Sequence, residues 1–189
     1  MKRDFWINQG LFQLSWPACV AGASWGVAGW TGTLVVAALV LWQLHPGRRH
    51  PNDWYMIGLC LGIGFVLDTL WLRTGLLAYA MPWPSNGFAP FWILLLWLAL
   101  ALVLNHSMSL FKERLWLIGM LAAVGSPISY YAGSRVGAVE WLAPVWQVVL
   151  ATGLSWALLL PGLFWLARRP PRRRDMPKAP DACIRSVMP

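Results

Sequence analysis

The chain has 189 residues, of which 58% are hydrophobic and only 12% are charged, and its mean hydropathy is +0.54. Soluble domains usually carry about twice that share of charge, roughly 25%. The composition therefore argues against a soluble globular enzyme, a nucleic-acid-binding domain and a disordered regulator. It predicts a small polytopic membrane protein.

Six apolar stretches follow one another along the chain, each close to the length of about 20 residues that a helix needs to cross a bilayer. They cover residues 5–24, 26–44, 54–72, 88–110, 115–133 and 141–167. We therefore predict an all-α fold, a membrane bundle of six transmembrane helices formed by residues 1–167. The first stretch is also compatible with a signal peptide cleaved after Ala21-Gly22-Ala23, although Gln13 and Pro17 make it a poor apolar region for one.

The basic residues predict the orientation of the bundle. Lys and Arg concentrate in the cytoplasmic loops of membrane proteins. With both termini in the cytoplasm of a bacterium, thirteen of the fifteen basic residues fall on the inner side of the inner membrane, and Arg73 and Arg135 fall outside.

The last segment, residues 168–189, is rich in arginine and proline. This composition cannot bury a core, so we predict a disordered cytoplasmic tail. Its arginines are expected to attract anionic lipid headgroups, or simply to anchor the topology. Nucleic acid is not an expected partner, because no folded platform accompanies the charge.

Cysteine and histidine are too few and too scattered for a metal or haem site. Cys19 and Cys60 lie in different apolar stretches, and His106 is the one histidine predicted inside a span. A zinc site needs three or four ligands at recognisable spacing. We expect no metal and no cofactor.

Ionisable and polar residues inside a bilayer are costly and usually face the interior of the bundle. One set of them lies toward the outer side, with Asp68 about five residues before the end of its span. We expect Asp68 to meet Tyr131 or Arg135 across the bundle, either as a structural contact or in an outward-opening pocket for a polar headgroup or small solute. The predicted outer cluster consists of Asp68, Arg73, Tyr130, Tyr131, Arg135 and Glu140.

A second polar set lies toward the cytoplasm. Such amides in membrane helices ordinarily form hydrogen bonds between helices, whereas His106 could instead exchange protons near neutral pH. The predicted depths of His106 and Asp68 differ by about 15 Å in a core about 30 Å thick, so the two should not form an acid–base pair. The predicted inner cluster consists of Asn8, Gln13, Asn105, His106 and Ser107.

Small residues and tryptophans are interpreted as packing residues. Gly58, Gly62 and Gly64 should allow close packing of the third span. Trp16 and Trp97 lie deeper than most of the tryptophans, which gather near span ends as indoles commonly do. The two halves of the chain show no match of the kind found in many transporters.

Several segments resemble the bacterial membrane family catalogued as domain of unknown function 2878. They are Asn8…Phe12-Gln13-Leu14-x-Trp16…Cys19-Val20, the Asp68 span, Leu96-Trp97…Leu104-Asn105-His106-Ser107, and Gly125-x-Pro127-x-x-Tyr130-x-x-Gly133 followed by Gly137-Ala138. The resemblance covers about residues 5–165. It implies a multi-pass inner-membrane protein, similar in setting to proteins encoded beside enzymes that modify membrane fatty acids.

Three functions stay open from the sequence. The first is an accessory or lipid-binding protein linked to fatty-acid or lipid modification, with membrane lipids and lipid-modifying enzymes as partners. The second is a transporter of a small solute or a lipid. The third is a membrane-embedded enzyme that uses Asp68.

Overall fold

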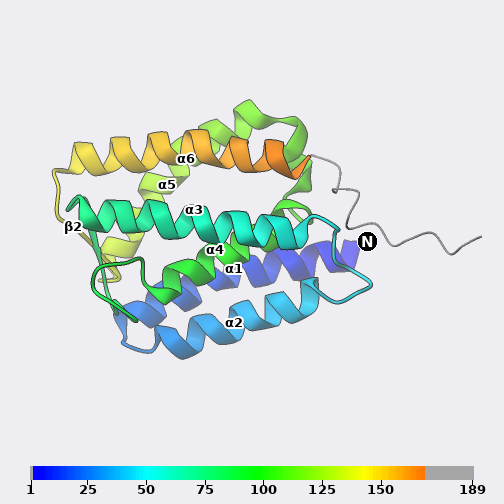
Figure 1. Ribbon diagram of the computed structural model, residues 1–189, viewed down its shortest axis with the longest axis horizontal. Coiled ribbons are helices and arrows are strands. Elements are labelled where there is room, and N and C mark those ends of the chain that lie inside the picture. The colour runs from blue at the N-terminus through cyan, green and yellow to red at the C-terminus, as the bar shows by residue number, and fades with distance from the viewer. Residues whose placement is uncertain (1, 169–189) are drawn as a thin grey trace, which may run out of the picture.

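The structure, a computed structural model, describes residues 2–168, and this part of the chain is mostly helical. Its six α-helices run back and forth between the two ends of the bundle (Figure 1). They are α1 (Lys2–Ser24), α2 (Ala28–Gln43), α3 (Asp53–Arg73), α4 (Phe91–Leu104), α5 (Leu115–Arg135) and α6 (Val145–Ala167). A short 3-10 helix, η1 (Ser109–Glu113), connects α4 to α5. The tail predicted for residues 168–189 lies outside the described residues, apart from Arg168.

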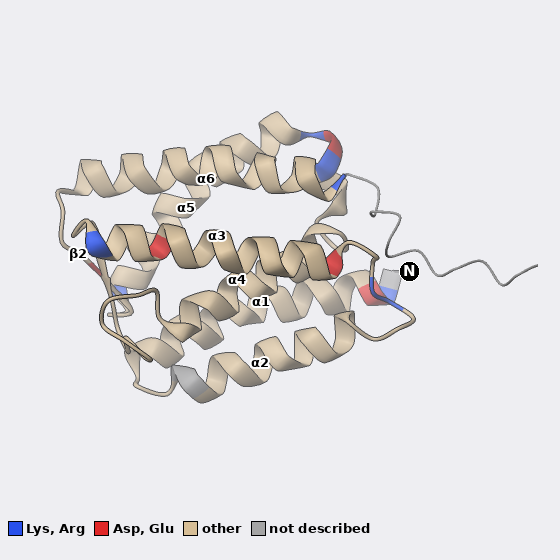
Figure 2. Ribbon diagram, in the orientation of Figure 1, with Lys and Arg blue, Asp and Glu red and all other residues tan. Residues whose placement is uncertain are grey.

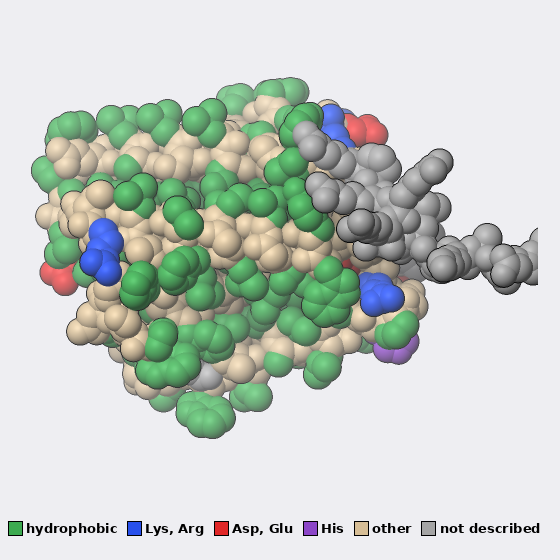
Figure 3. Space-filling view, viewed as in Figure 1, with side chains coloured by type: hydrophobic (Ala, Val, Ile, Leu, Met, Phe, Trp, Pro, Cys, Tyr) green, Lys and Arg blue, Asp and Glu red, His purple; other side chains and the backbone are tan. Residues whose placement is uncertain are grey.

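Three of these helices, α3, α5 and α6, are long and apolar enough to cross a membrane, and α4 and most of α2 are shorter apolar helices. Charged residues gather near the two ends of the bundle (Figure 2), and hydrophobic side chains cover the length of the visible face (Figure 3). Leu34, Leu41 and Leu158 are each more than two-thirds exposed. These features indicate a multi-pass membrane protein.

The fourth helix is shorter than predicted. The apolar stretch 88–110 forms a helix only over Phe91–Leu104, which is 14 residues, or roughly 21 Å. The helix lies inside the bundle and contacts α1, α2, α3 and α6, so that most of its side chains are buried. Because its neighbours are protein rather than lipid, α4 does not need the full span length.

Close helix contacts occur where one partner carries a glycine. A Cβ atom added at Gly32 of α2 would lie 2.6 Å from Cys19 Sγ of α1, and one at Gly153 of α6 would lie 3.0 Å from the Ala123 carbonyl oxygen of α5. At Gly64 of α3 it would lie 2.3 Å from the Trp97 ring of α4. Gly58 and Gly62, also predicted as packing residues, face open space.

The all-α prediction misses two short strands, β1 (Leu77–Tyr79) and β2 (Val139–Trp141). They form an antiparallel ribbon in which Ala78 faces Glu140. Each strand follows a long helix through a glycine with positive φ, Gly75 at +70° and Gly137 at +81°, a conformation that suits glycine at a helix end.

These helix ends reveal an internal repeat that was not predicted. At the end of α3 the Gly75 amide donates to the Leu72 carbonyl, and the Leu76 amide donates to the Trp71 carbonyl. The end of α5, 62 residues further along the chain, repeats this pattern. There the Gly137 amide donates to the Ser134 carbonyl, and the Ala138 amide donates to the Gly133 carbonyl. Both segments read Arg-x-Gly-x-x-x-aromatic, Arg73 to Tyr79 and Arg135 to Trp141. The units α3–β1–α4 and α5–β2–α6 are thus built alike, and the ribbon joins them.

Candidate functional site

Asp68 is fully buried at the centre of a cluster of hydrogen-bond donors, toward the end of the bundle that carries Arg73 and Arg135. The Tyr79 hydroxyl of β1 donates to Asp68 Oδ1 at 2.6 Å, and Trp97 Nε1 of α4 donates to Oδ2 at 2.7 Å. The Tyr130 hydroxyl of α5 also donates to Oδ1, at 3.3 Å. Burial, with the nearby Asp68 carboxyl, raises the pKa of Tyr79 well above its ordinary value, which keeps this hydroxyl protonated as a donor.

The predicted outer cluster is therefore only partly brought together. Asp68 and Tyr130, both members of the predicted cluster, are in contact, but the predicted pairing of Asp68 with Tyr131 or Arg135 is wrong. Tyr131 is 55% exposed and packs on Trp141. Arg135 and Glu140 are exposed as well.

Arg73, the remaining predicted member, lies apart from Asp68. Its Nε donates to the Gly87 carbonyl at 2.7 Å, which holds the loop between β1 and α4 against the end of α3. Tyr131 and Glu140 instead line a separate hollow of about 720 Å³, together with Ser134 and Trp141.

The inner polar residues form a continuous network around Asp53, whose role was not predicted. His106 Nε2 lies 2.9 Å from Asp53 Oδ2, and Asn105 Nδ2 donates to Oδ1 at 3.0 Å. Gln43 Nε2 lies 3.0 Å from His106 Nδ1, and Asn8 Nδ2 donates to Gln43 Oε1 at 2.7 Å. Side chains of α1, α2 and α3 are thereby connected to the turn after α4.

The backbone fixes the direction of these hydrogen bonds. Asn8 Nδ2 donates to the Leu102 carbonyl and Asn8 Oδ1 accepts from the Ser107 amide, so the Asn8 amide has one orientation. Gln43 must then present its oxygen to Asn8 and its Nε2–H to His106 Nδ1. His106 is therefore assigned as the neutral tautomer with a proton on Nε2, which donates to Asp53. Both ring nitrogens of His106 are thus engaged in hydrogen bonds with protein side chains.

The structure brings together Asn8, Asn105, His106 and Ser107 of the predicted inner cluster. His106 lies in the turn after α4 and not inside a helix. Gln13 is exposed on α1, outside this network. The structure also places His106 and Asp68 in separate hydrogen-bond networks, consistent with the predicted difference in depth.

Lys112, also missed from the sequence, connects the network to α6. Its Nζ donates to Asn105 Oδ1 at 2.8 Å and to the Ala167 carbonyl at 3.1 Å, at the end of α6 where a cation is favoured. Burial lowers the pKa of Lys112, and the Asp53 carboxylate opposes that shift. Burial likewise lowers the pKa of His50, which borders Asp53.

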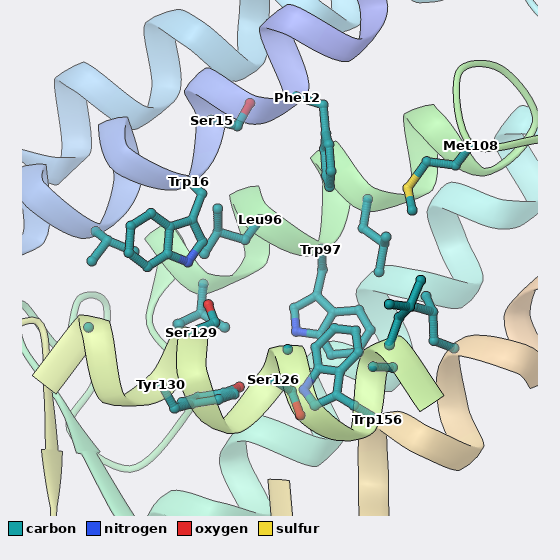
Figure 4. A pocket seen from close by; sticks show the side chains of 18 of the residues that line it. Phe12, Ser15, Trp16, Leu96, Trp97, Met108, Ser126, Ser129, Tyr130 and Trp156 are labelled. Carbon is teal, nitrogen blue, oxygen red and sulfur yellow. The ribbon is translucent and has the colours of Figure 1, made fainter. Parts of the chain in front are cut away.

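A third feature is an apolar groove of about 420 Å³ between α1 and α5, with α4 and α6 at its floor (Figure 4). Trp16 of α1 faces Ser129 of α5 across it, and Phe12 of α1 points toward Trp97. Trp97 and Trp156 stack on each other at 4.9 Å in the floor. The groove is exposed at Leu121 and Gly125, so it opens on the surface of the bundle.

The groove runs along most of the bundle. On α5 its lining extends from Ile118 to Gly133, which corresponds to roughly 22 Å of helix. At the end next to η1 it is closed by apolar side chains, Met108, Phe111 and Leu160. Because Trp97 and Tyr130 line the groove and also donate to Asp68, the groove and the Asp68 cluster share two side chains.

Within residues 2–168, no group of three or more His, Cys, Asp or Glu side chains is placed to hold a metal ion. No curated protein and no solved structure matches the chain. A family model does match, over residues 5–162, and its description is "Protein of unknown function (DUF2878)". Since the match covers most of the chain, including the Asp68 cluster and the apolar groove, the protein belongs to the DUF2878 family.

Proposed function

We propose that this protein is a lipid-binding membrane protein that holds one acyl chain in the groove between α1 and α5. In this proposal all six helices cross the bacterial inner membrane, and α1 begins and α6 ends on the cytoplasmic side. The observation that carries the proposal is the groove itself, which is long, apolar and open on the side of helices that are suited to lie in lipid.

The dimensions of the groove favour an acyl chain over a compact solute. Its volume lies within the range of about 300–1,000 Å³ typical of ligand sites. Its length of roughly 22 Å along α5 exceeds what a small solute would fill, and its walls are mainly aromatic and aliphatic. Acyl chains are the apolar molecules that surround such a surface in a bilayer.

The burial of Asp68 favours a binding role over a catalytic one. Both of its carboxyl oxygens accept hydrogen bonds from protein side chains, and the residue is 0% exposed. A bound chain would contact the Trp97 ring but not the carboxyl group. We therefore assign the protein to the accessory class, presenting a bound lipid to an enzyme that modifies membrane lipids.

The topology of the proposal rests on charge. Arg48 bridges to Asp4 at 3.2 Å, so the start of α1 and the loop after α2 lie at the same end of the bundle as the Lys112–Ala167 contact. This end carries more basic residues than the end with Arg73 and Arg135, as expected for the cytoplasmic side. Alkaline phosphatase fused after Ser85, an exposed residue of the opposite end, should be active. An inactive fusion at Ser85, with an active one in the loop after α2, would reverse the orientation.

A larger side chain placed in the groove tests the proposal. Gly125 lines the groove, and a Cβ atom added there would meet nothing within 4 Å. Gly125→Leu should therefore fold normally and displace at least two methylene groups of a bound chain. At about 0.8 kcal/mol per methylene, lipid occupancy should fall about tenfold. Occupancy is measured by native mass spectrometry of the purified protein after titration with a defined phospholipid.

Gly62→Leu is the matched control, because Gly62 is exposed on α3 and also faces open space. It should keep the occupancy of the unchanged protein. Equal occupancy in all three proteins would refute acyl-chain binding in this groove. If cross-linking from position 125 in cells captured a protein helix instead of lipid, the groove would be a protein interface.

A further inference from the structure

The wall of the groove is mainly apolar, and Trp16 and Ser129 are among its few polar side chains. Trp16 of α1 and Ser129 of α5 face each other across it, and both point into the open space (Figure 4). Among residues 2–168 neither the indole N–H of Trp16 nor the Ser129 hydroxyl has a protein hydrogen-bond partner. Two other groove serines differ in this respect, since Ser15 donates to the Leu11 carbonyl and Ser126 donates to the Thr152 carbonyl.

The indole N–H of Trp16 and the hydroxyl of Ser129 lie at a similar depth. Trp16 is eight residues before the end of α1, and Ser129 is six residues before the end of α5, so each lies roughly 9–12 Å below the outer end of its helix. The interfacial region of a bilayer is about 5–8 Å thick on each side. The pair is therefore placed just beneath it, where the polar linkage of an outer-leaflet lipid gives way to its chains.

We infer that Trp16 and Ser129 bind the carbonyl or carboxyl oxygen at the head of an acyl chain, so that the lipid enters from the outer leaflet and its methyl end points toward Met108 and Phe111. This inference rests on the proposed function and narrows its ligand to acyl lipids or fatty acids.

The chemistry of the pair selects this class. An indole N–H can only donate, and leaving it unpaired in an apolar site is costly. A carbonyl oxygen has two lone pairs and can accept from the indole and the hydroxyl together. A hydrocarbon chain offers no acceptor, and an ether-linked chain has no carbonyl oxygen.

The experiment titrates the purified protein with three probes in native mass spectrometry: a diester phosphatidylglycerol, its dialkyl-ether analogue with the same headgroup and chain length, and the free fatty acid. The unchanged protein should bind the diester about fivefold more tightly than the ether. The double variant Trp16→Phe/Ser129→Ala should bind the two phospholipids equally. The control variant Trp116→Phe/Ser134→Ala removes an indole and a hydroxyl that do not line the groove between α1 and α5. It should keep the fivefold preference for the diester.

Each outcome decides the inference. Fatty acid bound more tightly than diester, with the preference lost in the Trp16/Ser129 variant, would support the site and identify the free acid as its ligand. Equal binding of ester and ether by the unchanged protein would overturn the inference. If Gly125→Leu still weakened the binding of both phospholipids in that case, the proposed function would stand without this inference. If none of the probes bound, the proposed function itself would fail.

Discussion

Replacing Gly64 by alanine is expected to destabilise the protein by roughly 3 kcal/mol. The added Cβ atom would lie 2.3 Å from Cγ of the Trp97 ring, far inside van der Waals contact. The indole cannot simply turn aside, because its Nε1 is bonded to Asp68 and its ring is stacked on Trp156. Overpacking of this kind costs about 1–3 kcal/mol, and a broken buried hydrogen bond adds about 1–3 kcal/mol.

Gly62→Ala is the control for this prediction. Gly62 is two residues away on the same helix, and a Cβ atom there would meet nothing within 4 Å. The variant should be as stable as the unchanged protein, or up to about 1 kcal/mol more stable because alanine favours a helix. Both variants are compared by unfolding the detergent-solubilised protein with SDS or heat. Equal unfolding midpoints for the two variants would show that Trp97 is not held where the structure places it.

The apolar pattern was sufficient to predict six helices, because long apolar stretches separated by polar residues have few alternatives. It could not give the length of α4, since apolarity shows that a helix is covered but not whether protein or lipid covers it. The turn at Asn105 and His106 ends this helix early. Tertiary contacts with four other helices decide that boundary.

The partners of Asp68 show a different limit. Spacing along a single helix suggested Tyr131 and Arg135, but the true donors come from three elements, and Tyr79 is placed by a ribbon that hydropathy does not indicate. Trp97 was interpreted only as a packing residue, because an indole in a span gives no sign that its N–H has a partner. Asp53 immediately precedes the predicted stretch 54–72, so the search for polar residues inside the spans did not include it.

The sequence contains a repeat with an offset of 62 residues. The Arg-x-Gly-x-x-x-aromatic segments lie 62 residues apart, and the same offset relates Asp68 to Tyr130, which are hydrogen-bonded in the structure. Comparing the first three spans with the last three missed this repeat, because it relates α3–β1–α4 to α5–β2–α6. The repeat would have predicted the ribbon and part of the Asp68 cluster.

The Asp68 cluster gives the second large effect, expected for Asp68→Asn. The asparagine oxygen can still accept from Tyr79 and Tyr130, but its NH₂ group then faces Trp97 Nε1–H, so two donors oppose each other. Tyrosine hydroxyls can rotate, whereas an indole N–H has a fixed direction. The variant should lose roughly 2 kcal/mol of stability, within the range of about 1–3 kcal/mol for an unmatched buried donor.

Trp97→Phe distinguishes this cause from a general weakening of the fold. In the unchanged protein it removes a hydrogen bond to Asp68, whereas in the Asp68→Asn variant it removes the opposing donor, so the two substitutions should be less harmful together than their separate effects predict. A double-mutant cycle of unfolding free energies should give a coupling of at least about 1 kcal/mol, and strict additivity would contradict the prediction. Since the Trp97 ring also forms the floor of the groove, Asp68→Asn should weaken acyl-chain binding as well, although Asp68 does not line the groove.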